Sequence, residues 1–285
     1  MGKLTRAFEK SSSQKRQAET SALPRPNETY TPSNAGVSIV AGQGGPNTFG
    51  LPNDERWDER LRLSTDPHSQ IFESFRSLRA RLLYSESGQN PRTLLITSVM
   101  PGEGKGFVCA NLGIVLSQDI EHHALMLDCD FRRPSLARLF GLGNETGLVD
   151  YLQDSVDLSL LIRKTGQPKL SLLPSGRPPR NPSELLSSSR MISFVEAAKD
   201  RYQDRIVIFD SAPSHFASET RVLAKHIDGV ILVVRHGMAK KEDVKKFVDA
   251  IGSEKILGLV YNGCPEDKIG AFLNRRYGYG HYYYY

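Results

Sequence analysis

The sequence contains few cysteines and no long apolar run. Its three cysteines, Cys109, Cys129 and Cys264, form neither a CxxC pair nor a metal-ligand spacing, which favours reduced thiols over a disulfide framework. No stretch approaches the ~20 apolar residues of a membrane helix. The polar start, MGKLTRAFEK, fits neither a secretory signal nor a myristoylation site. We therefore expect a cytoplasmic protein that is recruited to the inner face of the cell membrane only through a partner.

The sequence also lacks a strong excess of charge of either sign. Its net charge of +5, with 24% charged and 39% hydrophobic residues, is ordinary for a globular protein. This charge permits contact with anions, acidic membranes or nucleic acid, but it requires none of them. A chain of 285 residues is long enough for one sizeable hydrophobic core with tails.

Composition divides the chain into three parts. Residues 1–55 are rich in Ser, Gln, Asn, Pro and Gly, so we expect a disordered N-terminal linker. Residues 56–270 carry the apolar pattern of a folded domain, and Trp57 is predicted to anchor the linker to it. Residues 271–285 are predicted to be a flexible tail. This tail holds six of the eleven tyrosines, namely Tyr277, Tyr279, Tyr282, Tyr283, Tyr284 and Tyr285.

The predicted domain begins with an amphipathic helix between residues 66 and 84. Apolar side chains recur at helical spacing on one face, which consists of Ile71, Phe75, Leu78 and Leu82. A charged stripe lies beside this face and consists of Glu73, Arg76 and Arg79.

An alternation of strands and helices follows the first helix. Continuous apolar runs, typical of strands buried on both faces, occupy residues 93–99, 124–130, 170–175, 205–212, 229–237 and 256–263. Amphipathic segments such as 183–202 and 240–252 separate several of these runs. The pattern predicts an α/β fold with a doubly wound, mostly parallel sheet. Ligands of such sheets bind at the carboxyl ends of the strands.

The first strand ends in a glycine-rich segment, PGEGKGF. Its glycines let backbone amides turn towards a phosphate, the following helix offers its positive end, and Lys105 supplies a charge for the β- and γ-phosphates. The predicted nucleotide-binding residues are Gly102, Glu103, Gly104, Lys105, Gly106 and Phe107. Position 106 departs from the usual loop, because a Ser or Thr normally follows the lysine and binds Mg²⁺ through its hydroxyl. Glycine has no such ligand.

Carboxylates end two further strands. Asp128 and Asp130 close the run ALMLDCD, and Asp210 closes RIVIFD. Residues two apart in a strand point the same way, so Asp128 and Asp130 would repel each other unless a cation compensates. A magnesium nucleotide would do so. All three aspartates are therefore candidate ligands of Mg²⁺, directly or through water.

These motifs together resemble the bacterial tyrosine kinases (BY-kinases), a family with a P-loop NTPase fold of the deviant Walker type. PGEGK is similar to the family's Walker A loop, LMLDCDFR to its Walker A′ motif and IVIFDSAP to its Walker B motif. The resemblance implies an enzyme that transfers phosphate from ATP, with Mg²⁺, to protein tyrosines. It assigns Asn262 to the neighbourhood of the adenine. Arg132 and Arg133, which follow the carboxylates of the second strand, are candidates to add positive charge at the γ-phosphate, and Lys105 is expected to hold the triphosphate. Asp128 matches the family's catalytic base, although the sequence does not separate the roles of Asp128 and Asp130.

The resemblance also assigns the tail and the charged stripe. Glu73, Arg76 and Arg79 match the ExxRxxR motif that joins subunits into rings, which implies an octamer-like homo-oligomer. The tyrosine-rich end matches the autophosphorylated cluster. A tail that starts near Ala271 extends about 50 Å at ~3.3 Å per residue, enough to reach a neighbouring subunit. The implied partners are a membrane chain-length-determinant protein, which activates the kinase, and a tyrosine phosphatase. Such a system controls exopolysaccharide or capsule synthesis and export.

Three other interpretations remain open. Gly106 is compatible with a catalytically weak or inactive nucleotide-binding scaffold of the same system. A partition-type ATPase has similar motifs, but it carries an extra lysine early in the loop, where this chain has Met100. A nucleic-acid binder would use the aromatic tail for stacking. That interpretation leaves the carboxylates at the strand ends unexplained, so no nucleic acid is expected.

Overall fold

The computed structural model describes residues 54–84, 91–201, 204–213 and 218–265. The predicted linker up to residue 53 and all six tail tyrosines lie outside the described residues. No helix in the described ranges is long and apolar enough to cross a membrane.

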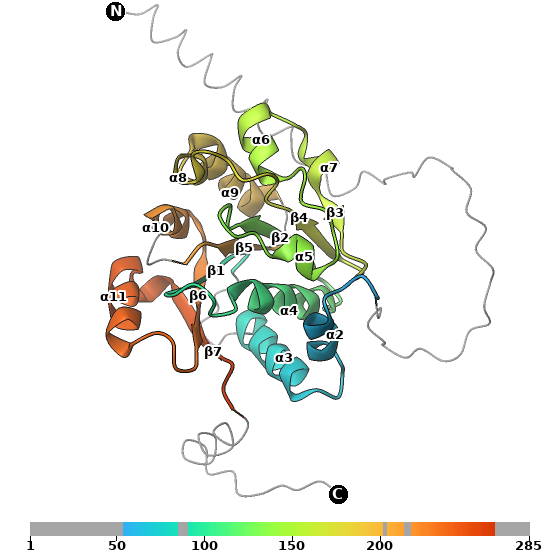
Figure 1. Ribbon diagram of the computed structural model, residues 1–285, viewed down its shortest axis with the longest axis vertical. Helices are drawn as coiled ribbons and strands as arrows, with labels where there is room; N and C mark the ends of the chain where they lie inside the picture. The colour runs from blue at the N-terminus through green and yellow to red at the C-terminus, as the bar shows by residue number, and fades with distance from the viewer. Residues whose placement is uncertain (1–53, 85–90, 202–203, 214–217, 266–285) are drawn as a thin grey trace, which may run out of the picture.

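A seven-stranded sheet runs through the domain (Figure 1). Its strands in chain order are β1 (Thr93–Ser98), β2 (His123–Cys129), β3 (Arg163–Lys164), β4 (Leu170–Leu173), β5 (Arg205–Ser211), β6 (Gly229–Arg235) and β7 (Ile256–Asn262). Their spatial order is β3-β4-β2-β5-β1-β6-β7, and every pairing is parallel except that of β3 with β4. All six predicted strands and the mostly parallel α/β fold are confirmed. Strand β3 escapes prediction from sequence, because its two residues are polar and exposed.

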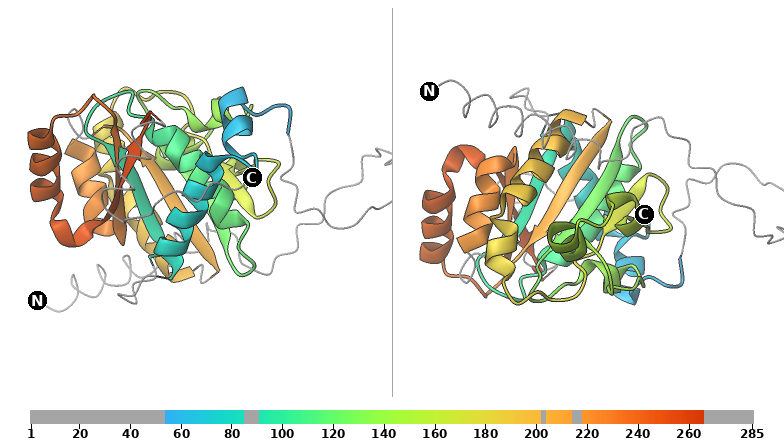
Figure 2. Two further views of the ribbon diagram at one scale, coloured as in Figure 1. Left: turned by 90° about the horizontal axis from the view of Figure 1, so that it is seen from below. Right: turned by 90° about the horizontal axis from the view of Figure 1, so that it is seen from above.

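Helices cover both faces of the sheet, and the two views of Figure 2 look onto these faces in turn. One face carries α2 (Glu59–Ser64), α3 (Gln70–Leu83), α4 (Lys105–Ser117) and α5 (Leu136–Leu139). The other carries α6 (Leu148–Asp154), α7 (Leu158–Leu161), α8 (Pro182–Leu186), α9 (Ser189–Arg201), α10 (Ser218–His226) and α11 (Lys241–Ile251). A 3₁₀ helix, η1 (Ser253–Lys255), precedes β7.

The sheet separates two hydrophobic cores, and the strand side chains alternate between them. In β1, Leu95 packs with the core under α6–α11, whereas Leu94 and Ile96 pack with the core under α2–α5. All six residues of β1 are buried, which explains its continuous apolar sequence. The chain passes from β1 to β2 through α4 on one face and from β5 to β6 through α10 on the other. Connections that diverge in this way open a crevice at the carboxyl ends of the strands.

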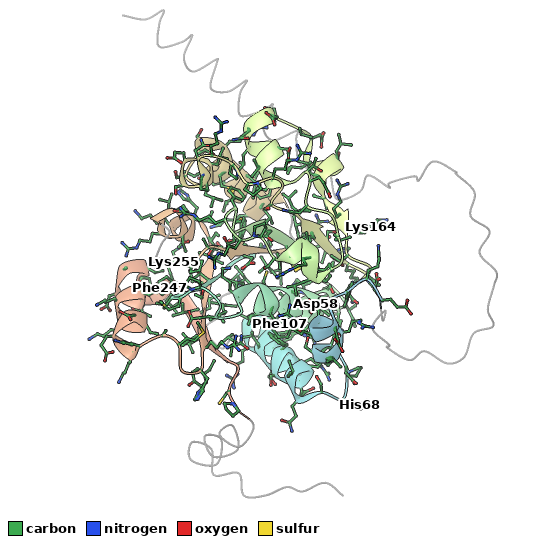
Figure 3. All side chains as sticks on the ribbon, viewed as in Figure 1. Asp58, His68, Phe107, Lys164, Phe247 and Lys255 are labelled. Carbon is green, nitrogen blue, oxygen red and sulfur yellow. The ribbon has the colours of Figure 1, made fainter. Side chains whose placement is uncertain are left out.

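The predicted anchoring role of Trp57 is confirmed. Its side chain is only 3% exposed, and its indole Nε1 donates to the carbonyl of Thr165 at 2.8 Å. The ring also packs edge-to-face on Phe140, with the centroids 5.2 Å apart. Next to it, the Asp58 carboxylate (Figure 3) accepts from the Arg60 amide and caps α2. The first turn of the described chain is therefore fixed to the domain.

Two helix predictions need correction. Helix α3 exists, but Phe72, Phe75 and Leu82 form its buried face, whereas Ile71 is 49% exposed. Positions 71 and 72 both fit the helical period, and packing against α4 decides between them. The predicted helix over 183–202 is in fact two helices, α8 and α9. The hydroxyl of Ser188 accepts from the Met191 amide and caps the second helix, as serines favour helix starts over helix interiors.

Candidate active site

The loop between β1 and α4 leaves backbone amides free at the start of the helix. Gly104 is the N-cap of α4, with φ +91° and no side-chain cap, and Gly102 has φ +83°. Both conformations favour glycine, because a Cβ strains the left-handed region. A Cβ at Gly104 would also collide with the amide of Asn262. The unsatisfied amides and the helix dipole make this end of α4 suitable for a phosphate.

Two of the predicted nucleotide-binding residues support the loop from behind. Glu103 is fully buried, and its carboxylate accepts from the amides of Met100 at 2.7 Å and Arg235 at 3.2 Å. Asn262, at the end of β7, donates to the carbonyl of Glu103 at 2.8 Å. Neither residue lines the cleft described below. Their contacts fix the shape of the loop, and the adenine contact of Asn262 stays a prediction.

Asp128 and Asp210 lie side by side at the ends of neighbouring strands. The two residues are paired in the parallel register of β2 with β5, and both are fully buried. Asp128 accepts from three backbone amides, those of Asp130 at 3.2 Å, Ser135 at 2.8 Å and Leu136 at 2.9 Å. Burial raises the pKa of Asp128 to about 6, although the amides of Leu136 and Ser135 oppose that shift. This carboxylate therefore fixes the turn between β2 and α5.

Asp210 has far fewer partners than Asp128. Its Oδ2 lies 3.5 Å from the hydroxyl of Ser135, which is long for a hydrogen bond. Its Oδ1 is buried and has no hydrogen-bond partner among the described residues. Burial raises the pKa of Asp210 to about 8, with Lys105 lowering it and Asp128 and Asp130 raising it further. An unpaired buried carboxylate is costly, so the arrangement indicates a site that a cation completes.

Lys105 points across the loop to the third carboxylate. Its Nζ lies 2.6 Å from Oδ2 of Asp130, and both side chains are largely buried. Burial disfavours the ammonium, but Asp210 and Asp130 outweigh that effect and raise the pKa of Lys105. The lysine is therefore charged, and it bridges the phosphate loop to the end of β2.

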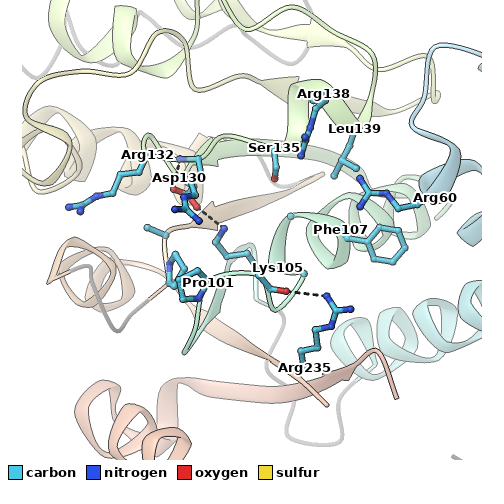
Figure 4. Close-up of a pocket in the computed structure, with 16 residues that line it drawn as sticks. Arg60, Pro101, Lys105, Phe107, Asp130, Arg132, Ser135, Arg138, Leu139 and Arg235 are labelled. Carbon is cyan, nitrogen blue, oxygen red and sulfur yellow. Dashed lines mark hydrogen bonds and ion pairs between the residues drawn. The ribbon is translucent and has the colours of Figure 1, made fainter. Parts of the chain in front are cut away.

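Lys105 and Asp130 line a cleft of about 680 Å³, and Figure 4 shows the two side chains in contact at its wall. Gly102, Gly104, Gly106 and Phe107 also line it. Among the described residues, its wall has one carboxylate, Asp130, and six cations, which are Arg60, Lys105, Arg132, Arg133, Arg138 and Arg235. Such a wall suits a polyanion such as a triphosphate.

Three of the cleft arginines carry no signal in the sequence. Arg60 belongs to α2, Arg138 to α5 and Arg235 to the end of β6. Each stands outside any motif, and only the fold brings them together. Arg235 also donates to the carbonyl of Gly102 at 3.3 Å, which ties β6 to the phosphate loop.

The predicted phosphate contact Arg132 reaches away from the loop. Its Nη2 lies 3.3 Å from Oε1 of Glu219, a buried carboxylate on α10, and 3.3 Å from the hydroxyl of Ser183. Ser183 in turn donates to the other oxygen of Glu219 at 3.0 Å. The contacts hold Arg132 at the rim of the cleft, between α8 and α10.

The charged stripe lies on α3, away from the cleft. Glu73 and Arg76 are exposed and pair with each other at 3.2 Å. Arg79 instead donates to the carbonyl of Val115, in the last turn of α4, at 2.8 Å. Glu73 and Arg76 are thus available at the surface, whereas Arg79 is partly occupied within the domain.

The three aspartates do not form a metal cage of their own. In the described part of the chain, no group of three or more His, Cys, Asp or Glu is arranged to hold a metal ion. Mg²⁺ is usually bound by one or two carboxylates together with substrate phosphates rather than by an all-protein cage. The unpartnered oxygen of Asp210, beside the phosphate loop, fits that mode.

Comparison with known proteins places this site in a family. No family model matches the sequence. The chain is 31% identical to tyrosine-protein kinase YwqD of Bacillus subtilis over 219 residues, which cover 76% of this chain and 91% of YwqD. Among solved structures, the chimerical protein CapA2B2 is 30% identical with a TM-score of 0.66, covering 72% of this chain and 90% of that one.

The kinase domain of the Escherichia coli tyrosine kinase ETK gives the same result. It is 28% identical with a TM-score of 0.66, and the match covers 82% of this chain and 91% of that domain. The likeness in fold therefore extends over the phosphate loop and the strand ends that form the cleft. With this much of a tyrosine-protein kinase matched in sequence and in structure, the chain belongs to the bacterial tyrosine kinase family.

Proposed function

We propose that this chain is an ATP-dependent protein-tyrosine autokinase that phosphorylates its own C-terminal tyrosines. One observation carries the proposal: Lys105, Asp130 and the helix α4 amides meet in an arginine-rich cleft, next to the unpartnered carboxylate of Asp210. A triphosphate needs cations and amides, and its metal needs a carboxylate oxygen.

The residues of the cleft have separable tasks in this proposal. Lys105 and the amides of Gly104 to Gly106 hold the β- and γ-phosphates, and the arginines of the wall neutralise the remaining charge. Asp210 and Asp130 hold Mg²⁺, directly or through water. The bound ion would supply charge stabilisation at the phosphates. These groups position the triphosphate, which is the main requirement for phosphoryl transfer.

The transfer itself exchanges one P–O bond for another. The tyrosine oxygen forms a bond to the γ-phosphorus, and the bond between that phosphorus and the β–γ bridging oxygen breaks, so that ADP leaves with the electron pair. A phenol has a pKa near 10, so a carboxylate that takes its proton assists the attack. Asp128 and Asp130 are both candidates. Asp130 lines the cleft, whereas Asp128 is held by three amides behind it.

We further propose that subunits phosphorylate one another's tails. Glu73 and Arg76, exposed on α3, would join copies of the chain into an octamer-like ring, in which each tail enters a neighbour's cleft. Each phosphotyrosine adds about −1.5 to −2 charges, so phosphorylated tails repel one another and the ring loosens. The proposed setting is exopolysaccharide or capsule export, with a membrane chain-length-determinant protein as activator and a tyrosine phosphatase that resets the cycle.

A mixing experiment with mass spectrometry tests this function. An active chain whose six tail tyrosines are replaced by Phe is incubated with Mg-ATP and a Lys105→Met chain that keeps its tail. We expect phosphate on tyrosines 277–285 of the Lys105→Met chain, because transfer occurs between subunits. Light scattering of both forms then shows whether phosphorylation reduces ring occupancy.

The other outcomes identify the rival functions. Release of inorganic phosphate without phosphotyrosine would point to a partition-type ATPase. Nucleotide binding with neither reaction would point to a scaffold. Either result would contradict the kinase proposal.

A further inference from the structure

Position 106 has no hydroxyl, but the structure shows why it has no room for one. A Cβ built on Gly106 would overlap the hydroxyl oxygen of Ser135 and lie 3.3 Å from the Cβ of Ser135. The same Cβ would lie 3.1 Å from Oδ2 of Asp210. The space that the side chain of a usual phosphate loop takes after its lysine is therefore filled from another part of the chain.

We infer that Ser135 supplies the magnesium-site hydroxyl that Gly106 lacks. This inference rests on the proposed use of Mg-nucleotide by the same cleft. Ser135 lies at the start of α5, thirty residues after the phosphate loop, and it lines the cleft. In Figure 4 its hydroxyl points into the cleft, on the side of Lys105. The hydroxyl and the missing side chain would thus occupy the same place beside Asp210.

The hydroxyl of Ser135 has no strong structural task that would explain it otherwise. Serine at a helix N-cap usually accepts from an amide of the first turn, yet the Ser135 side chain makes no such bond. Within the described part of the chain, its one hydrogen-bonding contact is the long approach to Oδ2 of Asp210 at 3.5 Å. Both of these oxygens therefore keep lone pairs for a cation or for a water bound to that cation.

The backbone holds Ser135 in this position without help from its side chain. The buried carboxylate of Asp128 accepts from the amides of Ser135 and Leu136 at 2.8 and 2.9 Å. The turn is thereby attached to the end of β2, next to β5 and Asp210. Neighbouring Asp210 also has a buried oxygen without a partner. This second observation points to a ligand independently of Ser135.

The geometry changes how a substitution at Gly106 should be interpreted. Adding a hydroxyl by Gly106→Ser alone crowds Ser135, so it does not restore a usual phosphate loop. Moving the hydroxyl requires both changes, Gly106→Ser and Ser135→Gly. Glycine at 135 removes the Cβ that would lie 3.3 Å from the new one.

Calorimetric titration with ADP, in Mg²⁺ and in EDTA, tests the inference. The measured quantity is the dissociation constant of ADP in EDTA divided by its dissociation constant in Mg²⁺. This ratio reports how much Mg²⁺ strengthens ADP binding. Ser135→Ala should lower this ratio about tenfold, as expected for one lost contact to a charged group, and leave the affinity in EDTA unchanged. The remote substitution Ser187→Ala is a matched control, because that exposed hydroxyl bonds only within α8.

If Ser135→Ala also weakens ADP binding in EDTA, that variant alone does not show whether the hydroxyl serves Mg²⁺. The double variant Gly106→Ser/Ser135→Gly then provides the test. Recovery of the ratio in the double variant, but not in Gly106→Ser alone, supports a relocated hydroxyl. An unchanged ratio in Ser135→Ala, or no recovery in the double variant, would overturn the inference. The titration involves no tyrosine. A Ser135-dependent ratio in a protein that never phosphorylates its tail would therefore contradict the proposed function and leave this inference standing.

Discussion

Asp128 and Asp210 occupy matching positions on adjacent strands, yet their surroundings are opposite. Asp128 receives three backbone amides and is satisfied within the protein. In the described ranges, one oxygen of Asp210 has no partner and the other lies 3.5 Å from the hydroxyl of Ser135. Both are fully buried, so exposure does not explain the contrast. The two residues share their position on the sheet, and the described difference is the turn after β2, whose amides donate to Asp128.

The contrast indicates different roles: Asp128 holds the backbone of the site in place, whereas Asp210 is available to bind a ligand. The turn after β2 folds back onto Asp128 and presents Ser135 and Asp130 to the cleft. Nothing in the described residues folds back onto Asp210 in the same way. We expect substitutions at the two positions to separate stability from metal binding.

The largest expected effect is on catalysis at Asp210. Asp210→Asn should lower the rate of tail phosphorylation about 100-fold, because it weakens the hold on Mg²⁺. Quantitative mass spectrometry of the tail peptides over time measures the rate. A rate within a few-fold of wild type would show that the unpartnered carboxylate does not serve the metal.

The second prediction concerns stability without nucleotide, where the two substitutions should act in opposite directions. Asp210→Asn removes a buried carboxyl group whose ionisation near pH 8 is opposed by burial, and it should stabilise the protein by about 1–2 kcal/mol. Asp128→Asn places an amide group against backbone N–H groups and should destabilise it by about 1–2 kcal/mol. Urea denaturation at pH 8 in EDTA measures both. Equal shifts would remove the distinction between the two residues.

The pH dependence of stability sharpens the same comparison. The pKa of Asp210 rises from 3.8 to about 8 on folding, so the folded state retains a proton that the unfolded state has lost. The contribution of Asp210 to the free energy of unfolding therefore falls as pH rises from about 4 to about 8. The difference between Asp210→Asn and wild type should be small at pH 5 and grow towards pH 8. Thermal melts in EDTA across this range measure it, and a constant difference would contradict the assignment.

The smallest effect is expected at Glu103, another buried carboxylate, whose bonding resembles that of Asp128. Both of its oxygens accept from backbone amides, those of Met100 and Arg235. Glu103→Gln should destabilise the protein by about 1 kcal/mol, because one amide loses its acceptor, and it should leave the Mg²⁺ contribution to ADP binding unchanged. Denaturation and titration of the same sample provide both values. If Glu103→Gln reduced the Mg²⁺ contribution to ADP binding, Glu103 would serve the metal site, as Asp210 does, rather than the loop structure alone.

The sequence predicts most of this fold, because its strands are long apolar runs with no competing pattern. All six runs are strands, and the motifs at three of their ends meet in one cleft. The buried face of α3 is less certain from sequence, because Ile71 and Phe72 both fit the helical period and only packing separates them.

Features that depend on long-range contacts could not be predicted from sequence. The arginines Arg60, Arg138 and Arg235 stand in no motif and reach the cleft from three separate elements. The meeting of Ser135 with Gly106 is of the same kind: the sequence indicates a missing hydroxyl, but the position of Ser135 depends on how the turn attaches to Asp128. Both the phosphate loop and this turn contribute to the site, and only their packing reveals it.

One measurement tests the central claim most directly, because activity alone does not distinguish a metal ligand from a candidate base. It is the contribution of Mg²⁺ to ADP affinity in wild type, Asp210→Asn and Asp128→Asn, titrated with and without EDTA at one pH. The account predicts that Asp210→Asn loses most of this contribution, whereas Asp128→Asn keeps a clearly larger share. If Asp210→Asn bound Mg-ADP as wild type does, the assignment of this strand end as the magnesium site would be wrong.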